Sequence, residues 1–176
     1  MLAIMTYFGC ANARAQSLHE AIKTVYQENL AELFVHFHRN PELSFREFET
    51  AKRLAQELRD LGYDVTEEVG GTGVVAVLEN GDGPTVMLRA DMDGLPLREQ
   101  TGLSYASSAK EVDITGIEQP VMPACGHDVH MTAMVGTARQ LMRRRHNWSG
   151  TLVLIGQPAE ERIGLAAAML RDGFQP

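Results

Sequence analysis

Cys125 and His127, with Asp128 and His130 close behind them, form the densest group of metal-ligating side chains in the sequence. A thiolate and an imidazole two residues apart can hold one metal ion. The group stands where a helix is expected to begin, and a helix N-terminus lowers the pKa of a thiol and so favours the thiolate. Taken alone, the group fits a buried cysteine beside a capping His or Asp equally well.

Glu160 and Glu161 are two adjacent carboxylates directly after the apolar run 151–156. A hydrolase that uses a metal ion needs some side chains to hold the ion and a separate base to take a proton from water. Two neighbouring carboxylates could divide these tasks. The competing interpretation is a helix N-terminus, which favours acidic residues for electrostatic reasons.

Asp91 and Asp93 follow the apolar run 85–90 at alternating positions. One carboxylate could face a metal ion while the other orients a ligating histidine. A simple Asp and Gly turn is the alternative for this segment. Because all three groups fall at predicted junctions between a strand or a loop and the next element, one shared site is the more economical interpretation.

The segments that must position these side chains alternate between helical and strand periodicity. Apolar spacing predicts helices over residues 17–38, 46–61, 127–144 and 160–171, a hairpin from 64–69 and 73–78, and buried strands at 85–90 and 151–156. Residues 94–124 are expected to be mostly loop, with room for short strands. This order predicts an α/β fold with a central mixed, largely parallel sheet flanked by helices, in which ligands gather at the carboxyl ends of the strands.

The bulk composition narrows the class of protein. The chain has 176 residues and a formal net charge of −7, which suits one globular domain and argues against a nucleic-acid partner. Two cysteines make no disulfide framework, and no segment has the length of a membrane span. Residues 1–15 resemble a signal-peptide remnant cleaved after Ala15, which predicts a periplasmic or secreted protein; otherwise the protein is cytoplasmic.

Four ordered segments resemble one enzyme family. They are His38–Ser44, Arg89–Pro96, Cys125–His130 and Gln157–Glu161. Their order and spacing are similar to those of the zinc-dependent aminoacylase and carboxypeptidase superfamily, in the branch of hippurate hydrolases, N-acyl-amino-acid amidohydrolases and indole-acetyl-amino-acid hydrolases. The resemblance covers residues 17–176, which it implies to be the N-terminal part of a catalytic domain.

The resemblance implies a role for each matching residue. The implied metal ligands are Cys125, His127 and Glu161, and the implied general base is Glu160. Four further residues are implied to line the site or to support its ligands; they are Asp91, Asp93, Asp128 and His130. Asp93 matches the acid behind the metal site, and Asp91 stands where related branches carry a metal-binding histidine.

The implied reaction is hydrolysis of the amide bond of N-acyl amino acids, such as hippurate-like conjugates. One or two zinc ions, or Mn²⁺ or Co²⁺ in their place, would polarise the carbonyl and acidify water, and Glu160 would carry the proton to the leaving amine. Family members continue beyond the position of Pro176 with a dimer-forming domain, further strands and two more ligating histidines, and they are often homodimers. We therefore expect weak metal binding and little turnover from these 176 residues alone.

Two alternatives remain at this stage. In one, Cys125 is the nucleophile of a cysteine hydrolase and His127 or His130 is its base, which leaves the Glu160–Glu161 pair without a role. In the other, the chain is a truncated, non-catalytic gene product.

Overall fold

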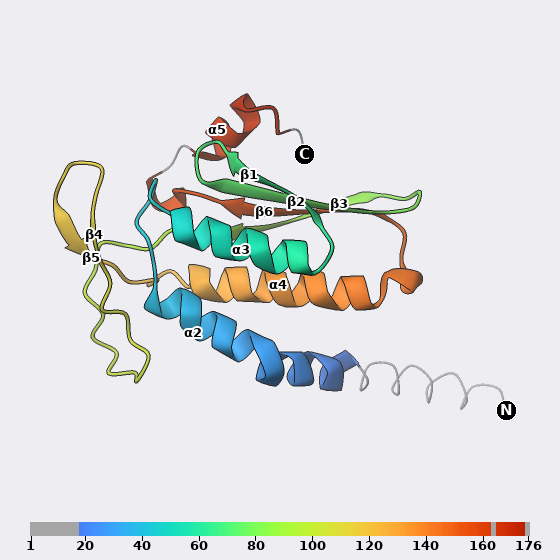
Figure 1. Cartoon of the computed structure of the whole chain (residues 1–176), viewed down its shortest axis with the longest axis horizontal. Coiled ribbons are helices and arrows are strands. Elements are labelled where there is room, and N and C mark those ends of the chain that lie inside the picture. Colours follow the sequence, from blue (N-terminus) through green and yellow to red (C-terminus); the bar gives the residue numbers. More distant parts are fainter. Residues whose placement is uncertain (1–17, 163–164, 175–176) are drawn as a thin grey trace, which may run out of the picture.

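A computed structural model describes residues 18–162 and 165–174 (Figure 1). The signal-peptide expectation for residues 1–15 lies outside the described residues. The elements in chain order are a helical segment over 18–25, a π-helical turn Tyr26–Leu30, α2 (Ala31–Arg39), α3 (Phe48–Asp60), β1 (Asp64–Val69), β2 (Gly73–Asn80), β3 (Thr85–Asp91), β4 (Lys110–Val112), β5 (Glu118–Pro120), α4 (His127–Arg143), a 3-10 turn Arg145–Asn147, β6 (Gly150–Gln157), a 3-10 turn Glu160–Arg162 and α5 (Leu165–Arg171).

The main sheet has four strands in the order β1-β2-β6-β3. The predicted hairpin is confirmed, with β1 and β2 antiparallel around the turn at 70–72. The prediction of a largely parallel sheet is wrong: β2 also pairs antiparallel with β6, and only β3 and β6 are parallel. The physical reason is that the described chain contains one strand-helix-strand crossover, β3-α4-β6, while the hairpin places β2 at the centre of the sheet.

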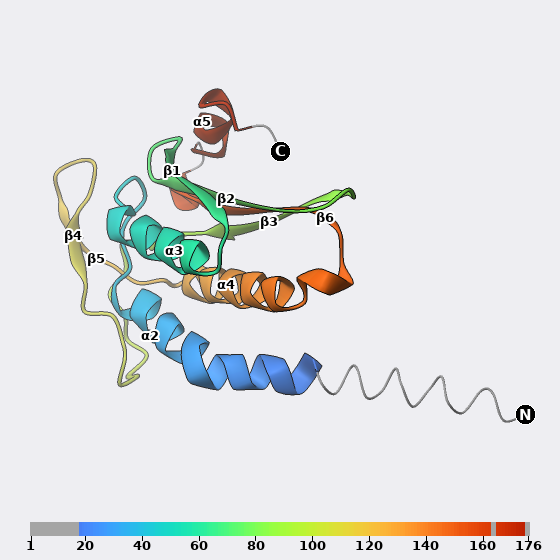
Figure 2. The same ribbon diagram turned by 45° about the vertical axis from the view of Figure 1, so that its right-hand side comes forward.

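Helices cover the two faces of this sheet unequally (Figures 1 and 2). Helices α2, α3 and α4 lie on one side, where they bury the main core with the inward residues of β2 and β6, such as Val74 and Leu154. The opposite face carries a smaller cluster in which Met169 of α5 packs on Val75 and Ile155. The alternation of neighbouring side chains between the two clusters is the two-residue period of a strand. Within the described residues no helix combines the length and apolar character that crossing a membrane requires.

Two segments differ from their predictions. The strand β3 was expected to be buried, but it is an edge of the sheet, and Val86 and Met87 are 57% and 49% exposed. The helix expected over 160–171 is divided into the 3-10 turn at Glu160–Arg162 and the short helix α5. The long loop 94–124 contains the small β4-β5 hairpin.

The crossover brings the chemically active segments together. Strands β3 and β6 are parallel and in register, so that Asp91 lies opposite Gln157 at their carboxyl ends. The amide of Met92 donates to the carbonyl of Gln157 over 3.1 Å, which keeps the two chains adjacent beyond the sheet. Helix α4 begins at His127, at the same edge. Residues from three distant parts of the sequence therefore surround one point.

Candidate metal centre

His127 is the first residue of α4 and the centre of the site. The preceding residue, Gly126, has φ +83°, a left-handed conformation that residues with a Cβ rarely adopt. This turn brings Cys125 back toward the helix, so that its sulfur shares a site with His127 and Glu161. The left-handed backbone conformation is therefore what favours glycine between the two ligands, since the space around Gly126 would admit a Cβ atom.

The imidazole of His127 has a defined orientation. Its Nδ1 lies 2.7 Å from the backbone carbonyl oxygen of Asp93. A carbonyl oxygen can only accept a hydrogen bond, so Nδ1 carries the proton and Nε2 of the neutral ring presents a lone pair. Metal-binding histidines are commonly oriented by such a bond.

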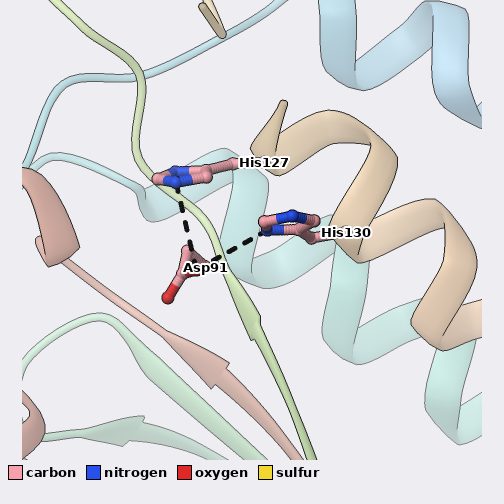
Figure 3. Close-up of side chains that lie close together, drawn as sticks. All are labelled: Asp91, His127 and His130. Carbon is pink, nitrogen blue, oxygen red and sulfur yellow. Dashed lines mark ion pairs between the residues drawn. The ribbon is translucent and has the colours of Figure 1, made fainter. Parts of the chain in front are cut away.

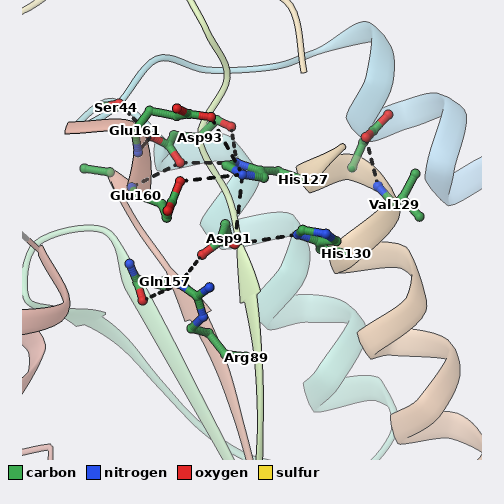
Figure 4. A network of polar contacts seen from close by, with 12 residues as sticks. Ser44, Arg89, Asp91, Asp93, His127, Val129, His130, Gln157, Glu160 and Glu161 are labelled. Atoms are coloured by element: carbon green, nitrogen blue, oxygen red, sulfur yellow. Dashed lines mark hydrogen bonds and ion pairs between the residues drawn. The ribbon is translucent and has the colours of Figure 1, made fainter. Parts of the chain in front are cut away.

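Three carboxylates surround the free Nε2 of His127 (Figure 4). One oxygen each of Asp91, Glu160 and Glu161 lies 3.9 Å from it. These distances are too long for hydrogen bonds. They suit donor atoms that share one ion, because ligands roughly 2.0–2.3 Å from a metal lie on the order of 3–4 Å from one another.

Asp93 supports this arrangement through buried hydrogen bonds. The residue is 2% exposed. It accepts hydrogen bonds from the hydroxyl of Ser44 at 2.6 Å and from the backbone amides of Glu160 and Glu161 at 3.2 and 3.0 Å. Asp93 therefore fixes the segment that carries both glutamates.

The pKa values of Asp93 and His127 move in opposite directions. Burial opposes the charged carboxylate of Asp93, but hydrogen bonds from His127, Ser44 and the Glu161 amide outweigh it and lower the pKa. Burial also opposes a charged imidazole, but the hydrogen bonds and charge of Asp93, with the charge of Asp91, raise the pKa of His127. The two shifts share one cause, the contact between His127 and Asp93, which stabilises the imidazolium and the carboxylate together.

The thiol of Cys125 is exposed and behaves differently from the sequence expectation. A hydrogen bond to Glu161, with smaller contributions from burial and from the charges of Glu161, Glu160 and Asp93, raises its pKa to about 11. The expectation that the start of α4 lowers this pKa is wrong, because the carboxylates near the thiol raise it. A thiol of this pKa is a poor nucleophile at neutral pH.

The chemistry of the site fits a divalent cation. Cys125, His127 and Glu161 place one donor atom each within 4.8 Å of the others, and sulfur, nitrogen and oxygen donors together suit zinc. The Oε1 atom of Glu161 is buried and has no hydrogen-bond partner in the described part of the chain. A buried carboxylate oxygen without a partner is costly unless a cation satisfies it.

A second set of donors shares His127 with the first. Asp91, His127 and His130 also lie within 4.8 Å of one another (Figure 3). Asp91 Oδ2 is 3.6 Å from His130 Nδ1, and Asp91 Oδ1 is 2.6 Å from the guanidinium of Arg89. Because the single lone pair on His127 Nε2 can bind one ion, the two sets are alternatives. Arg89 already neutralises Asp91, which favours the set with Cys125 and Glu161.

Asp128 does not join this cluster. It is next to His127 on α4, but its carboxylate lies 2.7 Å from Nδ1 of His38, whose Nε2 faces Glu99 at 3.2 Å. Burial opposes a positive charge on His38, yet the hydrogen bonds to Asp128 and Glu99 raise its pKa. The Asp128–His38–Glu99 chain connects α4 and α2 to the loop after β3 on the far side of the helix start.

Three supporting residues received no role from the sequence. They are Ser44, which binds Asp93; Arg89, which pairs with Asp91; and Glu47, a fully buried acid that binds the amide of Ala159. The segments His38–Ser44 and Arg89–Pro96 contained the signal for the first two. Glu47 stands among other charged residues and gave no signal.

A cavity of about 320 Å³ opens beside the cluster. Leu43, Leu95, Pro96 and Ile114 form its apolar wall, and Glu161 lies at its rim. A larger apolar groove of about 690 Å³, between the first helical segment and α4, touches none of the cluster's donors. The smaller cavity is the one that could hold a molecule against the site.

Comparison with known proteins agrees with this geometry. The family model described as peptidase family M20/M25/M40 matches residues 87–175. The chain is 48% identical over 138 residues to the hippurate hydrolase of Campylobacter jejuni, covering 78% of this chain and 33% of that protein. It is 43% identical over 136 residues to an IAA-amino acid hydrolase, ILR1-like 2, of Arabidopsis thaliana, covering 77% and 29%.

The fold agrees as well. A Bacillus subtilis protein, YxeP, whose crystal structure describes it as a dinuclear metal binding peptidase from the M20 family, superposes with a TM-score of 0.74 at 36% identity, covering 85% of this chain and 40% of that chain. The chain spans about a third of the length of the curated relatives it matches. With the family match over half of its residues, the chain belongs to peptidase family M20/M25/M40, in the branch that includes hippurate hydrolase and the IAA-amino acid hydrolases.

Proposed function

We propose that this chain is the N-terminal part of a metal-dependent amidohydrolase that cleaves the amide bond of N-acyl amino acids. The observation that carries the proposal is the arrangement around His127 Nε2, which faces Glu160 and Glu161 at 3.9 Å and shares a donor set with Cys125. In this proposal Cys125, His127 and Glu161 hold the ion. Zinc is the first choice for these donors, with Mn²⁺ or Co²⁺ as substitutes.

When bound, the ion would supply Lewis acidity that polarises the scissile carbonyl and lowers the pKa of water. The transfer of protons is left to a residue of the protein. Glu160 is the more exposed of the two glutamates, at 39% against 21% for the side chain, so it can meet solvent and substrate. It takes a proton from the attacking water and gives it to the departing amine. Water and amide are thus converted to a carboxylic acid and a free amine.

The cavity beside Glu161 supports an amide substrate with an apolar part. Its wall of Leu43, Leu95, Pro96 and Ile114 could contact an aryl or alkyl group, and a volume of about 320 Å³ lies within the usual range for small-molecule pockets. Similarity to hippurate hydrolase, at 48% identity, makes N-benzoylglycine the substrate to test first.

The two alternatives have less support. A cysteine hydrolase needs a reactive thiolate, whereas the carboxylates around Cys125 raise its pKa to about 11. The other alternative is a non-catalytic protein. Because the chain spans about a third of its relatives' length, this alternative has to be tested on the whole protein. It predicts an intact fold without hydrolysis.

One experiment separates these proposals. Zinc per chain is measured after dialysis in the wild type and in Cys125→Ser, and hydrolysis of N-benzoylglycine is then followed with and without a chelator. Zinc that is bound by the wild type and lost from the variant supports the metal site. Hydrolysis that survives complete chelation would exclude a metal amidohydrolase, whereas zinc bound without hydrolysis by the whole protein would favour the non-catalytic role.

A further inference from the structure

The segment Ala159–Glu161 is attached to the body of the protein by three consecutive backbone amides. The amide of Ala159 donates to Glu47 Oε1 at 2.7 Å, and those of Glu160 and Glu161 donate to Asp93. Two buried carboxylates therefore receive three successive N–H groups. The family resemblance assigns Asp93 to the site, but nothing in it or in the comparisons gives a role to Glu47.

Glu47 is placed as a support rather than as a surface charge. It is 0% exposed and stands just before α3, 112 positions from Ala159 in the sequence. Its other oxygen, Oε2, accepts a hydrogen bond of 2.6 Å from the hydroxyl of Thr72, in the turn between β1 and β2. No Lys, Arg or His of the described residues forms an ion pair with it. A buried acid without a cation is costly, so the hydrogen bonds that Glu47 accepts must offset that cost.

The backbone that Glu47 holds is strained. Ala159 has φ +46°, a left-handed conformation that costs a non-glycine residue on the order of 1 kcal/mol or more. Such a conformation persists only where surrounding contacts fix it. The bond to Glu47 is the contact made by Ala159's own amide, and the next two residues are Glu160 and Glu161.

We propose that Glu47 is a positioning residue: by holding the amide of Ala159 it fixes the left-handed turn that aims Glu160 and Glu161 at His127. The metal-binding consequence rests on the proposed function, but the positioning itself does not. Glu47 belongs to neither set of metal donors, and it acts through the backbone.

Two substitutions separate the hydrogen bond from the charge. In Glu47→Gln the side-chain oxygen can still accept from Ala159 while its amide donates to the Thr72 hydroxyl, so the turn is kept without the charge. In Glu47→Met a side chain of similar length fills the space but accepts nothing. Glu49→Gln is the matched control, because that side chain is 79% exposed and lies only two residues away, in the first turn of α3.

The first readout is amide hydrogen exchange of residues 159–161 in metal-free protein. We expect exchange in Glu47→Met to be roughly tenfold faster or more, and to stay close to wild type in Glu47→Gln and Glu49→Gln. The second readout is the Co²⁺ dissociation constant, followed by the absorption of the cobalt–thiolate band. Loss of a supporting contact of this kind weakens metal binding roughly 10–100-fold, which we expect for Glu47→Met but not for Glu47→Gln.

The outcomes are distinguishable. Unchanged exchange at 159–161 in a folded Glu47→Met protein overturns the positioning role. Failure of the wild type to bind Co²⁺ counts against the proposed function, while exchange still decides the role of Glu47. If Glu47→Met does not fold, Glu47→Asp replaces it, because the shorter side chain keeps the charge but withdraws the carboxylate from the Ala159 amide. Exchange like that of wild type in this variant contradicts the proposal.

Discussion

Asp93 Oδ2 accepts the backbone N–H of Glu161 at 3.0 Å, across 68 positions of sequence. The same carboxylate is 3.3 Å from His127 Nδ1 and accepts the hydroxyl of Ser44. One buried acid thus connects the strand β3, the segment after β6 and the start of α4. The two glutamates are positioned by this acid before any ion or substrate is considered.

Asp93→Asn should weaken both the fold and the site. An amide offers one acceptor oxygen where the carboxylate offers two, so at least one of the amides of Glu160 and Glu161 is left unpaired. Leaving a buried donor without a partner costs about 1–3 kcal/mol. Urea unfolding of the metal-free protein measures this loss. The exposed Asp82→Asn serves as control, and equal unfolding free energies for the two variants would contradict the role given to Asp93.

Zinc should raise the melting temperature through Cys125 and not through His130. An ion that binds only the folded state stabilises it by about 2.7 kcal/mol at a hundredfold excess over its dissociation constant. Thermal unfolding with and without zinc should show this shift in the wild type and in His130→Gln, and little shift in Cys125→Ser. The reverse result, a shift lost with His130, would place the ion at the Asp91, His127 and His130 set.

Glu160→Gln should keep the metal and lose the reaction. Glu160 is proposed to move a proton, and a general base contributes roughly 10²–10⁴-fold to a rate. The amide cannot take a proton, but the donors on Cys125, His127 and Glu161 are unaffected. We expect the zinc content of wild type and at least a hundredfold slower hydrolysis of N-benzoylglycine in any form that hydrolyses it. Zinc loss in this variant would identify Glu160 as a ligand instead.

Local signals in the sequence predicted most elements of the fold. The two-residue period around Gly70–Thr72 predicted the β1-β2 hairpin, and the apolar spacing after Cys125 predicted α4 to within a residue at each end. The order of the strands was not local information. Whether β2 pairs with β6, and in which direction, depends on contacts between residues seventy or more positions apart, which no period along the chain reveals.

The convergence of the candidate residues was predicted to the same extent, while their roles stay predictions. Residues at strand ends and at the start of α4 converge as expected, because β3 and β6 are parallel. Asp128 could not be assigned in this way: successive residues of a helix point in directions about 100° apart, so that the neighbour of His127 faces His38. Ser44 donates to the carboxylate of Asp93, and Glu47 accepts the backbone amide of Ala159. Both contacts join distant segments, and the residue types alone do not indicate them.

His38 should make stability depend on pH. Its folded pKa lies above the ordinary value of about 6.5 because of Asp128 and Glu99. Protonation is therefore favoured in the folded state, so the contribution is fully present below about pH 6.5 and is lost as the pH rises through the raised pKa. Urea unfolding of wild type and His38→Gln, in a chelator between roughly pH 5 and 9, should give a difference that shrinks with rising pH. A difference that grows would contradict the assignment.

Met87→Lys should reduce self-association without loss of stability. The strand β3 is an edge of the described sheet, and both Val86 and Met87 are about half exposed, at 57% and 49%. An open edge with apolar side chains can pair with another chain, and a lysine on such an edge opposes this pairing. Because Met87 lies outside both apolar clusters, its replacement should change the unfolding free energy by no more than about 0.5 kcal/mol. Light scattering at rising concentration measures the association.

The control is Thr85→Lys, which adds the same charge to the same strand at an already polar position. If both substitutions reduce self-association equally, the reduction is due to net charge and not to the loss of an apolar edge residue.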